Sequence, residues 1–309
     1  MNKQPLISLI TPCYNGQKYL LPNINSLLSQ SWSNVQYIFV NDGSTDETEE
    51  IILSYKEKFE AKGWEFVYIK KPNGGQASAV NAALPRIKGK YFCFLDSDDT
   101  IEPTYLEEYC NFLENNKEYK FCYARVKLVN CKKPDKILNI RERKILPGQQ
   151  DDFFQDLLTG HNLPIPAFFM AETRALDRVV KNRTIYESPI GQNFQIIAPL
   201  AYKYKCGYID KVLATYMLHD DSHNVSSSKS INDFKRLKFN IITSIEDMPV
   251  AEKLCNILLA SDFLDKRFAF DRWKTLRITL FKIPFIKIKH KPSKVKVYLF
   301  GIPILRIIR

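Results

Sequence analysis

The sequence predicts an α/β protein whose mostly parallel sheet is flanked by helices. Short, nearly continuous apolar runs recur through the first 130 residues, which is typical of strands buried on both faces of a parallel sheet. Segments with apolar residues at helical spacing separate these runs, and a polar loop follows each of the first four. Such alternation builds a sheet with right-handed crossovers, and ligands bind beyond the carboxyl ends of its strands.

Each predicted element follows from its local pattern. Apolar runs predict strands at 6–10, 35–40, 66–69, 91–95, 120–130 and 167–171, and a strand or hairpin at 207–218. Helical spacing predicts helices at 20–28, 51–59, 77–84, 103–113 and 193–204, and further helix within 231–270. Ser44 and Glu47 are spaced as a capping box for the second helix. The polar stretch 131–152 predicts irregular structure.

The composition is that of a globular protein with an unusual carboxyl-terminal segment. The chain has 309 residues, 45% apolar and 26% charged, which excludes a disordered chain, a collagen-like repeat and a disulfide miniprotein. The segment 272–309 holds eleven Lys and Arg and no acidic residue, whereas 1–271 holds 34 residues of each sign. A neutral body with a cationic tail argues against a nucleic-acid-binding protein.

The cysteines and the apolar runs bear on the compartment. The seven cysteines show no CxxC pair and no zinc-ligand spacing, so we expect reduced thiols, mostly in the core, in a cytosolic protein. The first ten residues hold too short an apolar run for a signal peptide. No stretch of 18 apolar residues occurs, so we expect no transmembrane helix.

The loop after the fourth apolar run carries the strongest chemical signal. Asp96 and Asp98 lie two residues apart at a strand end, so both carboxylates point the same way. Two hard oxygen ligands at one edge suit Mg²⁺ or Mn²⁺, which in turn bridges the phosphates of a substrate. The alternative is a polar turn that caps the next helix, although a cap does not require three neighbouring acids.

The other loops supply candidate nucleotide contacts. Asp42, after the second strand, can accept a hydrogen bond from a ring N–H or a ribose hydroxyl, since Ser44 and Glu47 already supply the helix cap. Tyr14 offers a flat face to a base, or it packs on the rim. Gly75 follows another glycine, and the pair permits close backbone approach to a ligand or forms a plain turn.

Four segments together carry a resemblance to a known family. In order, they are ISLITPCYNGQKYL, VNDGSTDET, NGGQASAVNAAL and FLDSDD, and a weaker match continues through 206–226. They resemble the nucleotide-sugar-binding half of a family 2 glycosyltransferase. The resemblance implies the GT-A fold, which is Rossmann-like, here with a helical and basic C-terminal extension. It divides the chain into a nucleotide-sugar-binding half at 1–130, an acceptor-side half at 131–230, a helical segment at 231–271 and a basic tail at 272–309.

The resemblance also implies roles for individual residues. The residues implied to hold the uracil and ribose of a UDP-sugar, or to line the same pocket, are Pro12, Tyr14, Asp42, Asn73, Gly75, Asn81 and Asp96. Asp98 would bind Mn²⁺ or Mg²⁺, and the pattern Tyr216–His219 resembles the segment in which relatives bring a histidine to the diphosphate and metal. His223 is a weaker candidate ligand.

The implied reaction is transfer of a hexosyl or N-acetylhexosaminyl group with inversion. A carboxylate would deprotonate the hydroxyl of a glycan or lipid-linked acceptor while the metal stabilises the departing diphosphate. By analogy, the pathway is surface polysaccharide or glycoconjugate biosynthesis.

Two positions depart from the family pattern. Val80 stands where many relatives carry arginine, which changes the pocket. Gly191 and Gln192 stand where relatives carry the Glu–Asp pair that opens the acceptor helix, and glutamine cannot act as a general base. Glu187 is the nearest carboxylate and our candidate base, with Asp220 and Asp221 as alternatives. Either the base has migrated or the acceptor geometry differs.

Three rival interpretations remain at this point. FLDSDDT also fits the first motif of haloacid-dehalogenase-like phosphatases, with Asp96 as nucleophile and Asp98 as acid/base, although that motif normally sits on the first strand. The missing Glu–Asp pair leaves open a catalytically inactive protein that only binds nucleotide sugars. A nucleic-acid module built on the tail would need aromatic residues interleaved with the charge, and the tail is mostly Ile, Leu and Val.

The tail 272–309 has a pattern of its own. Trp273, Leu276, Leu280 and Phe281 have helical spacing, and apolar residues then alternate with lysines on both sides of a KPSK turn. This predicts a hairpin with an apolar side and a lysine side. We expect it to lodge at an anionic membrane surface, which makes the protein a cytoplasmic one, peripheral at the inner face of the cell membrane. The alternative is that the apolar side packs on the body.

Overall fold

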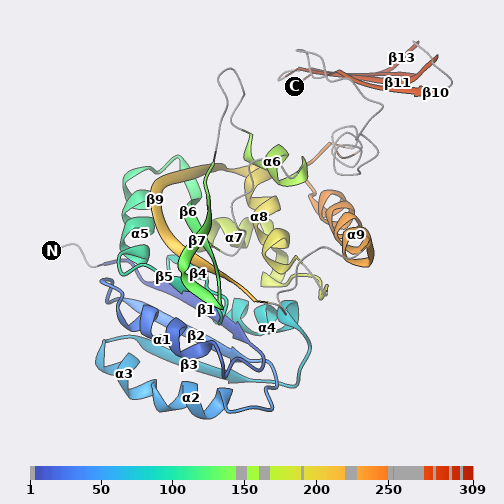
Figure 1. Cartoon of the computed structure of the whole chain (residues 1–309). Helices are drawn as coiled ribbons and strands as arrows, with labels where there is room; N and C mark the ends of the chain where they lie inside the picture. The colour runs from blue at the N-terminus through green and yellow to red at the C-terminus, as the bar shows by residue number, and fades with distance from the viewer. Residues whose placement is uncertain are drawn as a thin grey trace. The chain divides into compact units, whose positions relative to one another are not determined.

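A computed structural model of the chain shows two compact units, 1–231 and 232–309. The structure describes residues 4–143, 152–159, 168–188, 191–219, 228–249, 253, 275–280, 283–291, 294–299 and 302–308. Figure 1 shows the elements of each unit, coloured from blue at the N-terminus to red at the C-terminus.

The first unit is built on a nine-stranded mixed sheet with the order β3-β2-β1-β4-β8-β6-β9-β5, in which β7 pairs with β6. Its strands are β1 (Ile7–Cys13), β2 (Val35–Asn41), β3 (Glu65–Lys70), β4 (Tyr91–Phe94), β5 (Thr100–Ile101), β6 (Tyr119–Asn130), β7 (Lys133–Arg141), β8 (Phe169–Glu172) and β9 (Lys205–Leu218). Neighbours β3, β2, β1 and β4 are parallel, and β8 runs against both β4 and β6. Strand β6 therefore has the same direction as β4, and it is parallel to β9. The carboxyl ends of β1 to β4, β6 and β9 thus lie at the same edge of the sheet.

Helices cover both faces of this sheet. They are α1 (Leu20–Leu28), α2 (Thr48–Ser54), α3 (Lys56–Ala61), α4 (Gln76–Ala83), α5 (Tyr105–Asn115), α6 (Phe153–Thr159), α7 (Thr173–Val179) and α8 (Gln192–Lys203), with short 3₁₀ turns η1 (Leu84–Arg86) and η2 (Lys181–Arg183). Apolar residues of α1, α2, α3 and α5 share one buried cluster with alternate residues of β1 and β2, such as Leu9 and Tyr37. Helix α4 contacts β1 and β2 from outside that cluster, on the other face, and packs against α8.

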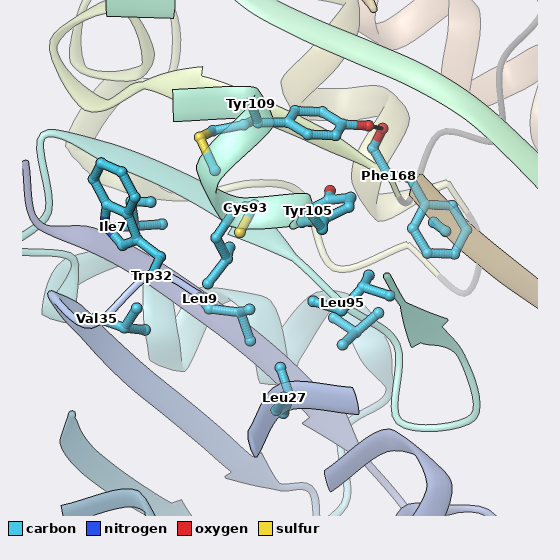
Figure 2. Close-up of a cluster of buried hydrophobic side chains, with 14 of the residues drawn as sticks. Ile7, Leu9, Leu27, Trp32, Val35, Cys93, Leu95, Tyr105, Tyr109 and Phe168 are labelled. Carbon is cyan, nitrogen blue, oxygen red and sulfur yellow. Dashed lines mark hydrogen bonds between the residues drawn. The ribbon is translucent and has the colours of Figure 1, made fainter. Parts of the chain in front are cut away.

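The main core lies between the sheet and the helices α1, α2, α3 and α5. All seven residues of β1 are buried, as are all seven of β2, which explains their continuous apolar runs. Figure 2 shows Leu9 and Cys93 on neighbouring strands facing Leu27 of α1 and Tyr105 of α5. Burying a side chain such as Leu or Ile contributes roughly 1.5–3 kcal/mol, so this cluster makes the strand ends a rigid support.

The structure differs from the sequence prediction at two strands. Residues 131–152 were expected to be irregular, but β7 pairs with β6 there. All of β7 is exposed, so no buried alternation marks it in the sequence, and its ladder hydrogen bonds alone define it. The helical spacing from Trp273 to Phe281 is also misleading, because Thr275–Leu280 forms strand β10. Its β-branched residues suit a strand paired on β11.

The second unit contains most of helix α9 (Ser228–Ser244) and a four-stranded antiparallel sheet. The strands β10 (Thr275–Leu280), β11 (Ile283–Lys291), β12 (Lys294–Leu299) and β13 (Ile302–Ile308) pair in chain order. The predicted hairpin is confirmed by the β11–β12 register, in which Ile288 pairs with Val297 and Lys289 with Lys296.

The register assigns the residues of this sheet to two faces, since paired residues share a face and successive residues alternate. The basic positions on one face are Arg277, Lys287, Lys289, Lys291, Lys294, Lys296 and Arg306. The aliphatic positions on the opposite face are Leu276, Ile278, Ile286, Ile288, Val295, Val297, Leu299, Leu305 and Ile307. Within the described part of the chain, no helix has the length and hydropathy needed to cross a bilayer.

The thiols are placed as expected where the structure describes them. Cys13, Cys93, Cys110, Cys122 and Cys206 are free and buried, whereas Cys131 is half-buried. Burial raises the pKa of the Cys13 thiol to about 11. The five buried cysteines therefore act as small core residues rather than as reactive thiols.

Candidate functional site

The loops that follow β1, β2, β3 and β4 meet at the carboxyl edge of the sheet. The backbone N–H of Asp42 donates to the carbonyl of Cys13 at 2.8 Å, so the first two loops start side by side. Gly43 has a φ of +74°, and a Cβ at this position would lie 2.6 Å from the backbone nitrogen of Asn73. Glycine is therefore required where the second loop crosses the third.

Asp42 organises the third loop. Its side chain is 3% exposed, and Oδ1 lies 2.5 Å from Nζ of Lys71. The same carboxylate accepts hydrogen bonds from the backbone N–H of Gly74 at 3.1 Å and of Gly75 at 2.8 Å. Gly75 has a φ of +84° and immediately precedes α4. Asp42 therefore fixes the turn that starts α4.

The prediction that Ser44 and Glu47 form a capping box on α2, which would leave Asp42 to bind a ligand, was wrong in its first part. No side chain of Ser44 or Glu47 caps α2. The hydroxyl of Ser44 instead accepts the backbone N–H of Asn15 at 3.0 Å, and Asp46 accepts the N–H of Thr48 at 3.1 Å. The acid immediately before Glu47 thus satisfies the first turn, because it is close enough to form a local turn with Thr48.

Asp96 lies at the end of β4, half-buried, beside the start of α4. Its Oδ1 accepts a hydrogen bond from Nε2 of Gln76 at 2.9 Å. Burial and, second, the charge of Asp98 raise the pKa of Asp96 to about 7. The carboxyl is therefore poised between its two protonation states near neutral pH.

Asp99 holds the acidic loop from below. It is fully buried, and its Oδ1 accepts the backbone N–H of Met217 in β9 at 2.9 Å. Burial and then the charges of Asp98 and Asp96 raise the pKa of Asp99 well above its usual range. Asn23 in α1 donates to the carbonyls of both Asp96 and Asp99 at 3.0 and 2.8 Å.

Sequence reasoning missed both Asn23 and Asp99 as supports of the site. The signal for Asn23 was a polar residue at a buried position of an apolar helix face. It is fully buried together with Leu20, Ile24 and Leu27 of α1. A buried amide needs hydrogen-bond partners, and the backbone of the acidic loop supplies them.

The structure brings together the two residues implied as metal ligands. Nε2 of His219, directly after β9, lies 3.5 Å from Oδ2 of Asp98. The His219 side chain is 5% exposed and the Asp98 side chain 35% exposed, so the pair has one solvent-facing side. The ring of Tyr19 packs on His219 with centroids 4.0 Å apart. The carboxylate suits Mn²⁺ or Mg²⁺ when a substrate supplies further oxygen ligands, and the imidazole nitrogen fits Mn²⁺ better than Mg²⁺, which prefers oxygen ligands.

No group of three or more ligating side chains forms a metal cluster within the described ranges. Asp220, Asp221 and His223 lie outside them. A bound ion would therefore need oxygen atoms from outside the pair Asp98 and His219, which fits a diphosphate partner.

The remaining predicted pocket residues lie at three kinds of position. Pro12 is buried in β1 opposite Val40. Tyr14 is 52% exposed, and Asn73 is exposed in the third loop. The carboxamide of Asn81 is engaged with the backbone of Ile185, donating to its carbonyl and accepting its N–H, both at 2.9 Å.

The two departures from the family pattern lie at α4 and at the start of α8. Val80 is 1% exposed, packed into the core, where an arginine would need a polar partner. Gln192 is the first residue of α8, after Gly191 with a φ of +71°. Glu187 is exposed on the segment that leads to this helix. The candidate base and the usual base position are thus on one continuous stretch.

Comparison with known proteins gives a consistent family. The family model described as "Glycosyl transferase family 2" matches residues 8–178. An uncharacterized glycosyltransferase of Rickettsia prowazekii is 34% identical over 191 residues, covering 59% of this chain and 57% of that protein. The Bacillus subtilis glycosyltransferase TuaG, named for teichuronic acid biosynthesis, is 41% identical over 112 residues, covering 36% of this chain and 43% of that protein. The chain thus spans only about half the length of these relatives.

A solved structure shows the same fold. TarS residues 1–349 of S. aureus, in complex with UDP-GlcNAc, superimposes with a TM-score of 0.62 at 21% identity. The match covers 86% of this chain and 73% of that chain. The predicted GT-A fold is confirmed.

Proposed function

Because the chain belongs to glycosyl transferase family 2, we propose that it moves a sugar from a UDP-sugar to a hydroxyl group of a glycan or lipid-linked acceptor. The observation that supports this most directly is the pair Asp98 and His219, 3.5 Å apart at the edge where the donor loops meet. The two residues come from ends of the sequence-distant strands β4 and β9, and a polar turn that merely caps α5 would not need His219.

We assign the nucleotide to the loops after β1, β2 and β3. Tyr14 would offer its exposed ring to the uracil, and Asp42 would meet the base or ribose at the third loop it organises. The neighbouring fold of TarS, solved with UDP-GlcNAc, supports a UDP-sugar as the donor class. The other residues assigned to this pocket are Pro12, Asn73, Gly75 and Asp96, and Asn81, whose carboxamide binds the backbone of Ile185, would support the pocket from α4.

Asp98 and His219 would hold a Mn²⁺ or Mg²⁺ ion, which would neutralise the negative charge that develops on the departing diphosphate. Asp96 would bind a ribose hydroxyl. The loop 96–99 is already fixed by Asn23 and Met217, so little reorganisation is needed when the donor binds.

Glu187 would act as the general base. It would accept the proton of the acceptor hydroxyl as that oxygen bonds to the anomeric carbon and the bond from this carbon to the diphosphate oxygen breaks. Attack from the side opposite the leaving group inverts the anomeric centre. Gln192 cannot accept this proton, and Glu187 lies on the segment directly before it.

The sugar and the pathway are proposed at class level. We favour a hexosyl or N-acetylhexosaminyl group, in line with the UDP-GlcNAc bound to TarS. Surface polysaccharide or glycoconjugate biosynthesis is supported by the likeness to TuaG, which is named for teichuronic acid biosynthesis.

We further propose that the sheet β10–β13 binds an anionic membrane surface at the cytoplasmic face. The register sets Lys289 opposite Lys296 and Lys291 opposite Lys294, and like charges that face each other across strands destabilise a sheet. An anionic surface would remove this repulsion. The aliphatic face would lie at the boundary between headgroups and acyl chains, next to a lipid-linked acceptor, and the long basic side chains would reach the anionic headgroups around the edges of the sheet.

The decisive experiment measures UDP binding and release with the full chain. UDP with Mn²⁺ should raise the melting temperature, and a panel of UDP-hexoses and UDP-N-acetylhexosamines should include one from which UDP is released. Asp98→Asn should lose the Mn²⁺-dependent part, and Asp135→Asn, an exposed acid on β7, should keep it. Binding without release from any donor would indicate an inactive binding protein. Phosphate release from phosphomonoesters alone would indicate a phosphatase.

A further inference from the structure

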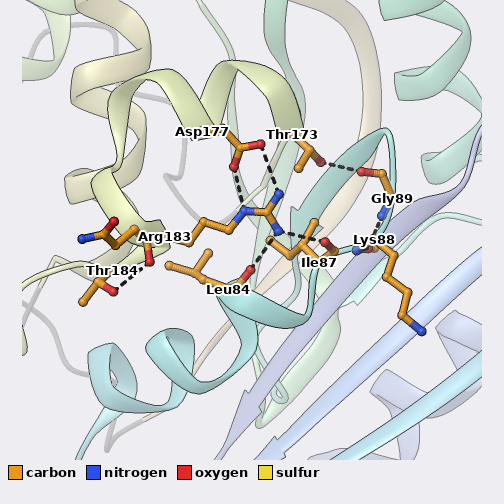
Figure 3. Close-up of polar contacts among 10 residues, drawn as sticks. Leu84, Ile87, Lys88, Gly89, Thr173, Asp177, Arg183 and Thr184 are labelled. Carbon is orange, nitrogen blue, oxygen red and sulfur yellow. Dashed lines mark hydrogen bonds and ion pairs between the residues drawn. The ribbon is translucent and has the colours of Figure 1, made fainter.

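The segment between α7 and α8 is anchored at its start by Arg183. Its guanidinium forms an ion pair with Asp177, with Nε 2.6 Å from Oδ1 (Figure 3). Nη1 of the same group donates to the carbonyls of Leu84 at 3.3 Å and Ile87 at 2.8 Å. One side chain thus ties this segment to the turn that precedes β4.

The backbone at this anchor is strained. Asn182 and Arg183 have φ values of +51° and +49°, in the left-handed region that non-glycine residues rarely adopt. Such a conformation persists only where surrounding contacts fix it. Strain of this kind is concentrated at functional sites, so the residues that follow this turn are candidates for a functional role.

Two carboxamides then hold the next two residues. Asn81 of α4 pairs with both the N–H and the carbonyl of Ile185. Gln195 of α8 does the same for Tyr186, accepting its N–H at 2.8 Å and donating to its carbonyl at 2.9 Å. The side chains replace the neighbouring strands that would normally satisfy an extended backbone, so the segment is rigid without belonging to a sheet.

This rigid backbone presents an exposed aromatic ring. Tyr186 is 68% exposed, the highest value among the large apolar side chains that the structure describes as exposed. Exposing a ring gains nothing for folding, whereas a ring on a fixed backbone binds a ligand with little loss of conformational entropy. A tyrosine ring offers an apolar face and a hydroxyl, which suits the mixed surface of a sugar.

The segment runs toward the carboxyl edge of the sheet, where the loops after β1, β2, β3 and β4 meet. Helix α8 leads into β9, which begins opposite Tyr119, the first residue of β6, at the edge away from the donor loops. The start of α8 therefore points toward the loop edge, and Gln195 lies in its first turn. Helix α4 begins at Gln76, which contacts Asp96. Tyr186 is thus held by Gln195 in the first turn of α8, and the preceding Ile185 is held by Asn81 in the second turn of α4.

We propose that Tyr186 forms an acceptor subsite, in which its ring stacks on the apolar face of a pyranose ring of the acceptor. This subsite rests on the proposed function and names its acceptor class as a pyranoside with an accessible C–H face. Glu187, the next residue, would then face a hydroxyl of the same sugar. Asn81, Arg183 and Gln195 are positioning residues that keep the ring in place.

The test is saturation-transfer NMR of the full chain with a panel of methyl hexosides and methyl N-acetylhexosaminides. We expect at least one glycoside to bind the wild type, and Tyr186→Ala to weaken it about fivefold to tenfold. Tyr186→Phe keeps the ring and should stay within about twofold of the wild type. Leu53→Ala, which removes another exposed apolar side chain on α2, should have no effect. Because Tyr186 is exposed, its replacement does not threaten folding.

The outcomes separate this inference from the proposed function. Failure of every glycoside to bind the wild type, or equal binding by Tyr186→Ala, would overturn the subsite. UDP binding is followed in the same samples by thermal shift and should be unchanged in Tyr186→Ala. If UDP does not bind but glycoside binding depends on the Tyr186 ring, the donor assignment fails and the sugar site stands.

Discussion

The carboxylate of Asp99 accepts the backbone N–H of Met217 at 2.9 Å, two residues before His219. This hydrogen bond joins the acidic loop after β4 to the end of β9, next to the short β5–β9 pairing of Thr100 with Thr215. Because Asp98 precedes Asp99 and His219 follows two residues after Met217, the bond and the β5–β9 pairing together hold the two proposed metal ligands near each other. Asp99 is therefore a positioning residue, beneath the site rather than in it.

Asp99→Ala should loosen this connection, whereas Asp99→Asn should preserve it. Alanine leaves the Met217 N–H buried without its acceptor, which costs about 1–3 kcal/mol of unfolding free energy. Asparagine keeps an acceptor oxygen of the same shape. Urea unfolding gives the free energy of unfolding. Thermal shift by UDP with and without Mn²⁺ gives the Mn²⁺-dependent part of the rise in melting temperature, which should fall in the alanine variant alone. Equal Mn²⁺ responses in the two variants would contradict a positioning role.

Asp42→Asn should destabilise the chain far more than Glu49→Gln does. The Asp42–Lys71 pair is largely buried and carries two backbone hydrogen bonds in addition, so its loss should cost on the order of 2–3 kcal/mol. The neighbouring pair Lys70–Glu49 is exposed, and such pairs contribute about 0–1 kcal/mol. Urea unfolding of both variants tests the comparison. Similar losses would mean that Asp42 does not organise the third loop.

The fold could be predicted from the sequence where a buried strand requires a continuous run of apolar residues. Strands β1 and β2 are buried at every residue, so their apolar runs identify them directly. Strand β7 is exposed at every residue and leaves no such signal. The basic sheet β10–β13 was recognised only in part, because a four-residue helical spacing and a two-residue alternation overlap in 273–281.

The candidate site could be predicted as a set of loops but not as a network. Asp96, Asp98 and His219 lie in recognisable motifs, and the structure brings Asp98 and His219 together. The partners of Asp42 are backbone amides of Gly74 and Gly75, which no side-chain pattern encodes. Hydrogen bonds to the backbone depend on where the chain folds in space, so the supporting residues emerge only with the structure.

Stability should fall as the pH rises from about 4 to about 7, and Asp96→Asn should reduce that fall. The pKa of Asp96 is raised from 3.8 to about 7, so across this window the native state keeps a proton that the unfolded state releases. Below this pH window Asp96 is protonated in both states, and above it Asp96 is ionised in both. Its contribution to the free energy of unfolding is therefore constant outside the window. Urea unfolding at several pH values measures the slope. An unchanged slope in the asparagine variant would show that Asp96 titrates normally.

Glu187→Gln should lower sugar transfer while UDP binding stays unchanged. A positioned general base contributes about 10²–10⁴-fold to the rate, and glutamine cannot accept a proton. Gln192→Ala is the matched control, because this residue occupies the usual base position without being able to act as a base, and its effect should be milder. UDP release with the best donor and acceptor, together with thermal shift by UDP, separates the rate from binding. Near wild-type turnover in Glu187→Gln would assign the base to another residue.

Full-length chain should bind liposomes that contain anionic lipid at low salt, and a chain ending at Asp271 should not. Each basic residue near an anionic surface contributes about 1 kcal/mol, and salt screens the attraction within a Debye length. Replacing Lys287, Lys289 and Lys296 by glutamine removes three charges from one face of the sheet and should weaken binding strongly. Lys56→Gln with Lys58→Gln removes exposed charge from α3 and should matter little, because the body is neutral overall. Co-sedimentation at low and high salt measures each case, with UDP binding as evidence that the truncated chain is folded. A full-length chain that ignores anionic liposomes at low salt would place the aliphatic face against protein instead of lipid.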